Sequence, residues 1–254
     1  MNKWYITPRP RPNATVRLIC FPYAGGSVGS FCSWPSQLPE HVEVNIIQLP
    51  GRGAHFDRAP IDSMDELIAE LVPKITHLLS KDYVIFGHSL GSRVGFEVVC
   101  SALELGLKAP QHFFASGSAG PQKQCFKDKV YEYEDSEFMR ELERMKGTPE
   151  EILANRELME LYLPMLRADF KVAGQYSYQG SVTVPSEVTV FYGKSDAVSE
   201  KEVEMWGELF LGFDSVAFDG GHFFIDTQQE KIINKLNDFF NGVDFTKTKH
   251  LTFS

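Results

Sequence analysis

Short, almost continuously apolar runs recur along the chain, and segments with a polar or helical pattern separate them. Runs of this kind are typical of strands that are buried on both faces of a parallel sheet. They cover Val16–Phe21, Val42–Leu49, Tyr83–Phe86, His112–Ser116, Glu187–Tyr192 and Ser215–Phe218. The pattern therefore predicts a mostly parallel central sheet.

The helix expected between the second and third runs has a marked beginning. Ser63 and Glu66 have the spacing of a capping box, in which two side chains satisfy free backbone N–H groups. This helix is expected to continue to about Ser80, with a kink at Pro73 because proline removes a helical hydrogen bond.

Further helices are predicted after the third run and around the last one. Apolar residues from Leu90 to Ala102 share one helical face, and Gly106 ends that helix. Two more helices are expected over Glu200–Phe210 and Gln228–Phe240. Strands that alternate with helices predict an α/β fold whose sheet is covered by helices on both faces.

The segment from about 125 to 173 interrupts this alternation. It has helical periodicity without a strand pattern, and it is about three times as long as a usual crossover connection. Its large apolar side chains include Phe138, Met139, Leu142, Met145, Leu158, Leu161, Tyr162, Met165 and Leu166. We predict a helical lid over an apolar pocket, inserted in a single domain that spans residues 1–254. The alternative is a set of ordinary crossover helices.

Composition and charge narrow the function classes. The 254 residues are 43% hydrophobic and 23% charged, as in an ordinary globular protein, and their formal net charge is −9. This balance gives no reason to expect nucleic acid or an anionic membrane surface as a partner.

Nothing in the sequence indicates export or a membrane span. The amino terminus has no apolar run of the signal-peptide kind, and no stretch reaches the roughly 18 apolar residues of a transmembrane helix. The cysteines are widely spaced without a C-x-x-C pair, which is typical of free thiols in a reducing compartment. We expect a cytoplasmic protein.

The pattern G-x-S-x-G, which places a nucleophilic serine on a sharp turn from strand to helix, occurs twice. The matches are Gly25–Gly29 and Gly87–Gly91. Ser89 follows a short apolar strand and begins an amphipathic helix, whereas the residues after Ser27 do not begin such a helix. The context therefore favours Ser89 as the nucleophile.

The earlier glycine loop suits a different role. It follows the first long strand, where such enzymes place the second donor of an oxyanion hole. The backbone N–H groups of Ala24 and Leu90 are then expected to face one oxygen atom. The alternative is a glycine turn without a catalytic role.

A base and an acid are expected late in the chain. His222 lies in a glycine-rich loop between the last strand and the last helix, whereas His88 is directed elsewhere by the turn at Ser89. Asp196 follows the strand that ends at Tyr192, and it is favoured over the competing Asp214 and Asp219. The chain order serine, aspartate, histidine is that of the α/β-hydrolase fold.

Together these residues resemble the type II thioesterases of polyketide and nonribosomal peptide synthesis over nearly the whole chain. The matching segments are Phe21–Gly26, Leu49–Gly53, Gly87–Gly91, Gly147–Pro149, Leu163–Phe170 and Gly220–Phe224. The segments in the expected lid discriminate best because they lie outside the machinery that all such hydrolases share.

The resemblance implies an editing enzyme that hydrolyses stalled or aberrant acyl and aminoacyl groups from the phosphopantetheine arm of a carrier protein. The acyl group would pass to Ser89, the carrier thiol would leave, and water activated by His222 would release the acid. Neither a metal nor a bound cofactor is implied. We expect a monomer whose partner is an acyl or peptidyl carrier protein.

Some residues depart from the family pattern or have an open role. Leu90 stands where methionine is frequent, which keeps the N–H donor. Ser92 and Arg93 replace smaller or apolar residues and are expected to alter the pocket rim. Arg52 is best interpreted as a solvated or loop-bracing residue. Local basic patches for a carrier protein are available at Arg9, Arg11 and Arg17, or at Lys123, Lys127 and Lys129.

Three other functions remain open on the sequence. A generic carboxylesterase or lipase would have the same triad, and so would an acyltransferase with an acceptor other than water. A catalytically silent module that only binds a carrier protein is the third, although the complete triad argues against it.

Overall fold

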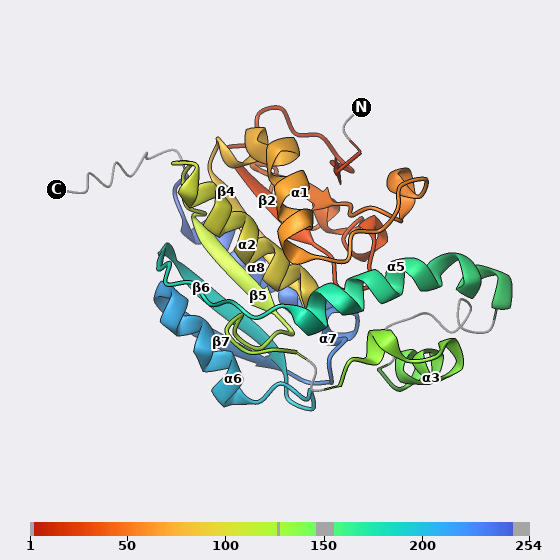
Figure 1. Ribbon diagram of the computed structural model, residues 1–254. Helices are drawn as coiled ribbons and strands as arrows, with labels where there is room; N and C mark the ends of the chain where they lie inside the picture. The colour runs from red at the N-terminus through yellow and green to blue at the C-terminus, as the bar shows by residue number, and fades with distance from the viewer. Residues whose placement is uncertain (1–2, 126–127, 146–154, 246–254) are drawn as a thin grey trace.

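The computed structural model describes residues 3–125, 128–145 and 155–245 (Figure 1). A sheet with the strand order β1-β3-β2-β4-β5-β6-β7 crosses the molecule. The strands are β1 (Tyr5–Ile6), β2 (Val16–Phe21), β3 (Val42–Ile47), β4 (Tyr83–His88), β5 (His112–Ser116), β6 (Val184–Gly193) and β7 (Phe210–Phe218). β1 is antiparallel to β3, and the other neighbouring strands are parallel. The predicted mostly parallel sheet is confirmed.

Helices cover both faces of this sheet, as the alternation of patterns predicts. They are α1 (Met64–Leu79), α2 (Leu90–Glu104), α3 (Asp135–Met145), α5 (Arg156–Gln175), α6 (Glu200–Glu204), α7 (Phe224–Thr227) and α8 (Gln229–Gly242). Figure 1 shows α1 and α2 in front of the strands and α8 behind them. Each face has its own apolar core, because side chains alternate along the strands: Ile19 packs toward α1 and α2, and Leu18 toward α7 and α8.

A third apolar cluster lies in the segment expected to form a lid. α3 and α5 enclose it, and both helices extend to one side of the sheet in Figure 1. Its buried members include Phe138, Leu142, Met165, Leu166 and Phe170. The helical periodicity of this segment is therefore real, and its apolar side chains form a small core of their own.

The structure differs from the sequence predictions at a few elements. α1 begins at Met64, but the Ser63 side chain makes no capping hydrogen bond. A capping box forms instead between Ser199 and Glu202 at the start of α6. The helix expected over Glu200–Phe210 is shorter, because a 3-10 helix follows α6 and β7 begins at Phe210.

The edge strands were the hardest to predict. β1 has two residues, too few to show a period. β7 pairs only with β6, so much of it is exposed and its pattern is mixed rather than apolar. The apolar-run pattern therefore detects only its last residues.

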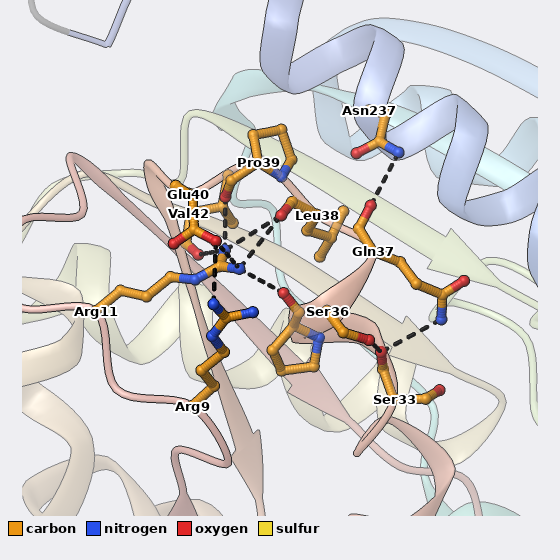
Figure 2. A network of polar contacts seen from close by, with 11 residues as sticks. Arg9, Arg11, Ser33, Ser36, Gln37, Leu38, Pro39, Glu40, Val42 and Asn237 are labelled. Carbon is orange, nitrogen blue, oxygen red and sulfur yellow. Dashed lines mark hydrogen bonds and ion pairs between the residues drawn. The ribbon is translucent and has the colours of Figure 1, made fainter.

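A buried arginine stabilises the loop at the amino end of the sheet. Figure 2 shows Arg11 just before β2, with its guanidinium directed into the loop that leads to β3. It donates to the carbonyl oxygens of Pro39 at 2.6 Å and Val42 at 2.7 Å, and to those of Pro35 and Leu38. These bonds supply donors to carbonyls of the loop and of the first residue of β3.

No helix within the described ranges is long and apolar enough to cross a bilayer.

Candidate active site

Ser89 occupies a sharp turn between β4 and α2. Its φ of 55° makes it the only non-glycine residue with positive φ in the described part of the chain. The Ser89 N–H donates to the Ser116 carbonyl at 2.7 Å, which attaches the turn to the end of β5. A Cβ atom on Gly91 would lie 2.0 Å from the Phe21 carbonyl oxygen, so only glycine permits this approach of α2 to β2. The turn presents the Ser89 hydroxyl at the carboxyl edge of the sheet.

Two residues from distant loops meet Ser89 at this edge. His222 lies between β7 and α7, and its Nε2 is 2.9 Å from Ser89 Oγ. Asp196 follows β6, and its Oδ2 is 2.9 Å from His222 Nδ1. Because a carboxylate only accepts hydrogen bonds, Nδ1 carries the proton and Nε2 is left to accept from the Ser89 hydroxyl. The arrangement is able to remove the hydroxyl proton during attack on a carbonyl carbon.

Asp196 is held in place for this contact. Its side chain is 4% exposed, and its Oδ1 accepts the Ala197 N–H at 2.6 Å. The competing Asp219 instead pairs with Lys194 on the surface at 2.7 Å. Ser27, from the other motif match, accepts the Gly29 N–H at the start of a 3-10 helix. The structure thus brings together Ser89, Asp196 and His222, and leaves the competitors elsewhere.

His88 is fully buried beside this group and contacts the backbone of the His222 loop. Its Nε2–H donates to the His222 carbonyl at 3.1 Å, so its Nδ1 accepts from the Ser116 hydroxyl at 2.8 Å. Burial first, and then the nearby His222 ring, lower the pKa of His88 well below its ordinary value. The ring is therefore neutral, as these two hydrogen bonds require.

The residues expected to form an oxyanion hole come from two segments near Ser89. Leu90 is the first residue of α2, where a helix leaves its N–H groups free. Ala24 lies in the turn after β2 and lines the same cavity as Ser89. Neither N–H donates to a protein acceptor among the described residues. Both remain available to an oxygen atom of a ligand.

A cavity of about 520 Å³ opens at Ser89. Its lining includes Tyr23, Ala24, Ser89, His222 and Phe223. The helices α3 and α5 contribute Leu142, Met145, Phe170 and Ala173. The helices of the interrupted segment thus form an apolar part of the wall of the cavity that contains the reactive hydroxyl.

Possible metal ligands do not gather here. In the parts of the chain that the structure describes, no three His, Cys, Asp or Glu side chains are placed to hold a metal ion. The four cysteines are free thiols.

Two expectations about polar residues near the pocket are wrong. Ser92 and Arg93 are fully buried and do not line the cavity, so they do not form its rim. Ser92 Oγ donates to the Gly87 carbonyl at 2.7 Å, and Arg93 packs over the Tyr176 ring at 5.7 Å. Both residues lie beneath the turn and do not face a substrate.

The prediction of a basic surface patch that includes Arg11 is also wrong. The Arg11 side chain is 5% exposed, and its N–H groups donate to backbone carbonyls of the protein. In the other patch, Lys123 and Lys129 pair with Glu202 and Glu132, and Lys127 lies outside the described residues. The motif segment Gly147–Pro149 lies outside them as well.

Sequence reasoning missed Asp169, a buried carboxylate of α5 next to the turn at Ala24. It accepts a bidentate ion pair from Arg52 and the N–H of Gly25. Arg52 is 5% exposed, so the solvated alternative is wrong and the bracing alternative is right. The only signal for Asp169 was its place in the segment Leu163–Phe170, which carries no local pattern for an ion pair.

Comparisons with known proteins agree with this geometry. The family model described as "Thioesterase domain" matches residues 16–240. The gramicidin S biosynthesis protein GrsT of Aneurinibacillus migulanus is 34% identical over 235 residues, which cover 92% of each chain. The crystal structure of ClbQ from the colibactin NRPS/PKS pathway has a TM-score of 0.85 and 28% identity, covering 90% of this chain and 98% of ClbQ.

A second solved structure has a similar likeness. The type II thioesterase BorB from the borrelidin biosynthetic cluster has a TM-score of 0.85 and 28% identity, covering 92% of this chain and 96% of BorB. These neighbours share the sheet and the covering helices, so the predicted fold class is confirmed.

Proposed function

The chain belongs to the thioesterase family, as a type II thioesterase, and from this premise we propose that it hydrolyses acyl groups from carrier proteins of polyketide or nonribosomal peptide synthesis. Ser89 is the nucleophile, His222 the general base, and Asp196 the carboxylate that holds the required tautomer of His222. The observation that carries the proposal is the continuous line of 2.9 Å contacts from Ser89 Oγ through His222 to Asp196.

In the first half-reaction, Ser89 Oγ attacks the thioester carbonyl carbon while His222 Nε2 takes the hydroxyl proton. The N–H groups of Ala24 and Leu90 donate to the oxyanion that forms. Collapse of this intermediate breaks the carbon–sulfur bond, and His222 returns the proton to the departing pantetheine sulfur. An acyl ester on Ser89 remains.

In the second half-reaction, water attacks the acyl ester and gives its proton to His222 Nε2. The same N–H groups stabilise the second oxyanion. Collapse restores the Ser89 hydroxyl with the proton from His222, and the free acid leaves. The Asp196 carboxylate stabilises the positively charged imidazole in both halves.

The substrate class is an editing substrate, a stalled or aberrant acyl or aminoacyl group. The cavity of about 520 Å³ is of a size to hold a small acyl group. Residues from about 125 to 173 act as the lid of a single domain over residues 1–254, and the apolar wall from α3 and α5 supports this role. The protein acts as a cytoplasmic monomer on its carrier protein.

The experiment is intact-mass measurement after incubation with a panel of acyl-loaded carrier proteins. The wild-type protein is expected to convert acyl carrier protein to the free thiol form and to release the acid. Ser89→Ala should abolish this turnover and the acyl-enzyme, by roughly the 10⁶-fold that loss of a serine nucleophile costs in kcat. Ser27→Ala, in the other motif match, is the matched control and should keep wild-type turnover.

Three further measurements separate the competing functions. A higher kcat/KM for an oxygen ester than for a thioester of the same acyl group would indicate a carboxylesterase. Transfer of the acyl group to an acceptor other than water would indicate an acyltransferase. Binding of the carrier protein without turnover by the wild-type protein would indicate a silent binding module.

A further inference from the structure

The turn that carries Ala24 is held by hydrogen bonds at Tyr23, Gly25 and Gly26. Its Tyr23 carbonyl accepts the Gly26 N–H at 2.8 Å, which closes the turn. In a trans peptide the carbonyl and the following N–H point in opposite directions. Because the Tyr23 carbonyl points into the turn, the Ala24 N–H points out of it. The orientation of this donor therefore depends on how firmly the turn is held.

Two buried side chains hold the outer groups of the turn. Asp169 Oδ2 accepts the Gly25 N–H at 2.7 Å, and Arg52 Nη1 donates to the Gly26 carbonyl at 3.0 Å. The same two side chains form a bidentate pair, with distances of 2.8 and 2.6 Å between their nitrogen and oxygen atoms. The turn is thus bonded to a planar, pre-organised unit that allows it little rotation.

This unit connects three parts of the chain that are far apart in sequence. Arg52 comes from the loop after β3, Asp169 from α5, and the turn from the end of β2. α5 also packs directly on the turn, since a Cβ atom on Gly25 would lie 2.6 Å from Leu166 Cδ2. The two ionic side chains are 5% and 4% exposed, so water does not compete for their hydrogen bonds.

A buried ion pair is by itself a weak source of stability, because removing two charges from water costs about as much as their attraction returns. A function in stability alone would therefore be served as well by two apolar side chains. What apolar side chains would not supply are the hydrogen bonds to the Gly25 N–H and the Gly26 carbonyl. The pair lies where those bonds determine the direction of a neighbouring donor.

We infer that Arg52 and Asp169 are positioning residues, which hold the Ala24 N–H in the direction needed to stabilise the oxyanion of thioester hydrolysis. This inference rests on the proposed role of the Ala24 N–H. It also connects the turn to α5 through Asp169. Neither side chain lines the cavity at Ser89.

The first test is Asp169→Asn, which keeps the shape of the side chain but replaces one acceptor oxygen by a donor. We expect kcat for an acyl-pantetheine thioester to fall about 10- to 100-fold, less than the roughly 10²- to 10³-fold cost of deleting an oxyanion donor. KM should change less than kcat, because the ground-state contacts remain. The concentration of active sites is measured by titration with a fluorophosphonate, so that misfolded protein is not counted.

A second readout separates positioning from a structural role. A trifluoromethyl ketone with the same acyl chain forms a tetrahedral adduct on Ser89 and so places an oxyanion in the hole. Its inhibition constant should rise by the same factor by which kcat/KM falls, since both report binding of the transition state. The matched control is Asp135→Asn, which makes the same change in an exposed ion pair to α5 at 2.6 Å. It should leave kcat within about twofold, as for a surface site.

The double variant Arg52→Met/Asp169→Leu decides the case if Asp169→Asn fails to fold. Replacing both partners removes the unpaired buried charge and restores stability. Its kcat should nevertheless stay at least tenfold below that of the wild type. Wild-type kcat in this variant or in folded Asp169→Asn, or an unchanged inhibition constant for the ketone, would overturn the inference. Turnover by Ser89→Ala would instead overturn the proposed function, so the two failures are distinguishable.

Discussion

Two buried arginines, Arg11 and Arg52, lie at opposite ends of the sheet and use the same side-chain chemistry for different purposes. Arg11 precedes β2, and its guanidinium donates to backbone carbonyls of one loop. Arg52 follows β3, and its guanidinium binds a carboxylate and the turn next to Ala24. Each side chain is 5% exposed. Burial of an arginine therefore does not by itself indicate a role in catalysis.

The two ends differ in their backbone as well. Apart from Gly106, the positive φ values of the described residues occur just after strands, at the carboxyl end: Gly25, Gly51, Gly53, Ser89, Gly117 and Gly220. That end also leaves the N–H groups of Ala24 and Leu90 without protein acceptors, whereas the carbonyls around Arg11 are occupied. The end proposed to perform the chemistry thus combines unused N–H groups with the strained backbone of Ser89. Saturated groups on ordinary backbone mark the end that stabilises the fold.

The largest effect is expected at the carboxyl end, from Asp196→Asn. An amide can donate to His222 Nδ1 and would then favour the wrong tautomer, so kcat should fall on the order of 10⁴-fold, as in serine proteases. The melting temperature should change little. Single-turnover hydrolysis of an acyl-pantetheine thioester measures this effect.

The matched control for this variant is Asp219→Asn. Asp219 lies in the same loop as His222 but pairs with Lys194 on the surface, so kcat should not change. An equal loss in both variants would mean that the carboxyl end is sensitive to any change of charge. The loss of activity in Asp196→Asn could then not be attributed to its hydrogen bond with His222, and the two ends of the sheet would not differ in the way described.

The second effect is expected at the amino end, from Arg11→Met. The apolar stem is kept, but the carbonyls of Pro35, Leu38 and Val42 lose their guanidinium donor. We expect the free energy of unfolding to fall by about 2–4 kcal/mol, because an unsatisfied buried acceptor costs about 1–3 kcal/mol and the loop relaxes in part. Equilibrium unfolding in urea measures this loss.

The Arg11→Met variant should lose stability without losing activity. Its kcat per titrated active site should equal that of the wild type, because no contact of Arg11 reaches the carboxyl end. Arg9→Met is the matched control: Arg9 is 56% exposed and pairs with an exposed Glu40, so its loss should cost under about 0.5 kcal/mol. A tenfold lower kcat in folded Arg11→Met would show that the two ends are coupled.

The comparison also explains what was predictable from the sequence. The buried strands are predictable because both of their faces are apolar. The proposed site residues, which the structure brings together, are predictable because a serine hydrolase uses a known order of motifs. Arg52 and Asp169 are 117 residues apart, and neither has a local pattern that selects the other. The sequence predicts a surface patch at Arg11 because charge alone does not show whether a loop folds over a side chain. Ion pairs and hydrogen bonds between residues far apart in the sequence therefore cannot be predicted from local sequence patterns.

The smallest effect concerns two buried histidines, one at each end. His112 is the first residue of β5, where burial lowers its pKa to about 4, and it contacts the Thr189 hydroxyl at 2.9 Å. His88 is the last residue of β4, and its pKa is lowered by burial as well. The ordinary pKa of about 6.5 applies to both in the unfolded chain. Between pH 6.5 and about 4 the unfolded chain therefore binds protons that the folded protein does not.

The sign follows from this difference in proton binding. The stability contributed by each neutral histidine is complete above pH 6.5 and is lost as the pH falls, at about 1.4 kcal/mol per pH unit for each group. In His112→Asn the free energy of unfolding should fall less steeply with decreasing pH, by the contribution of one histidine, about 1.4 kcal/mol per pH unit. Its kcat at pH 8 should not change. In His88→Asn the slope should fall similarly, but kcat should also fall about tenfold, because the lost hydrogen bond joins His88 to the backbone of His222, the proposed general base. Urea unfolding at pH 5 and pH 8, with kcat at pH 8, measures both. Equal kcat values in the two variants would show that His88, like His112, affects only stability. The two buried histidines would then differ only in their location in the sheet.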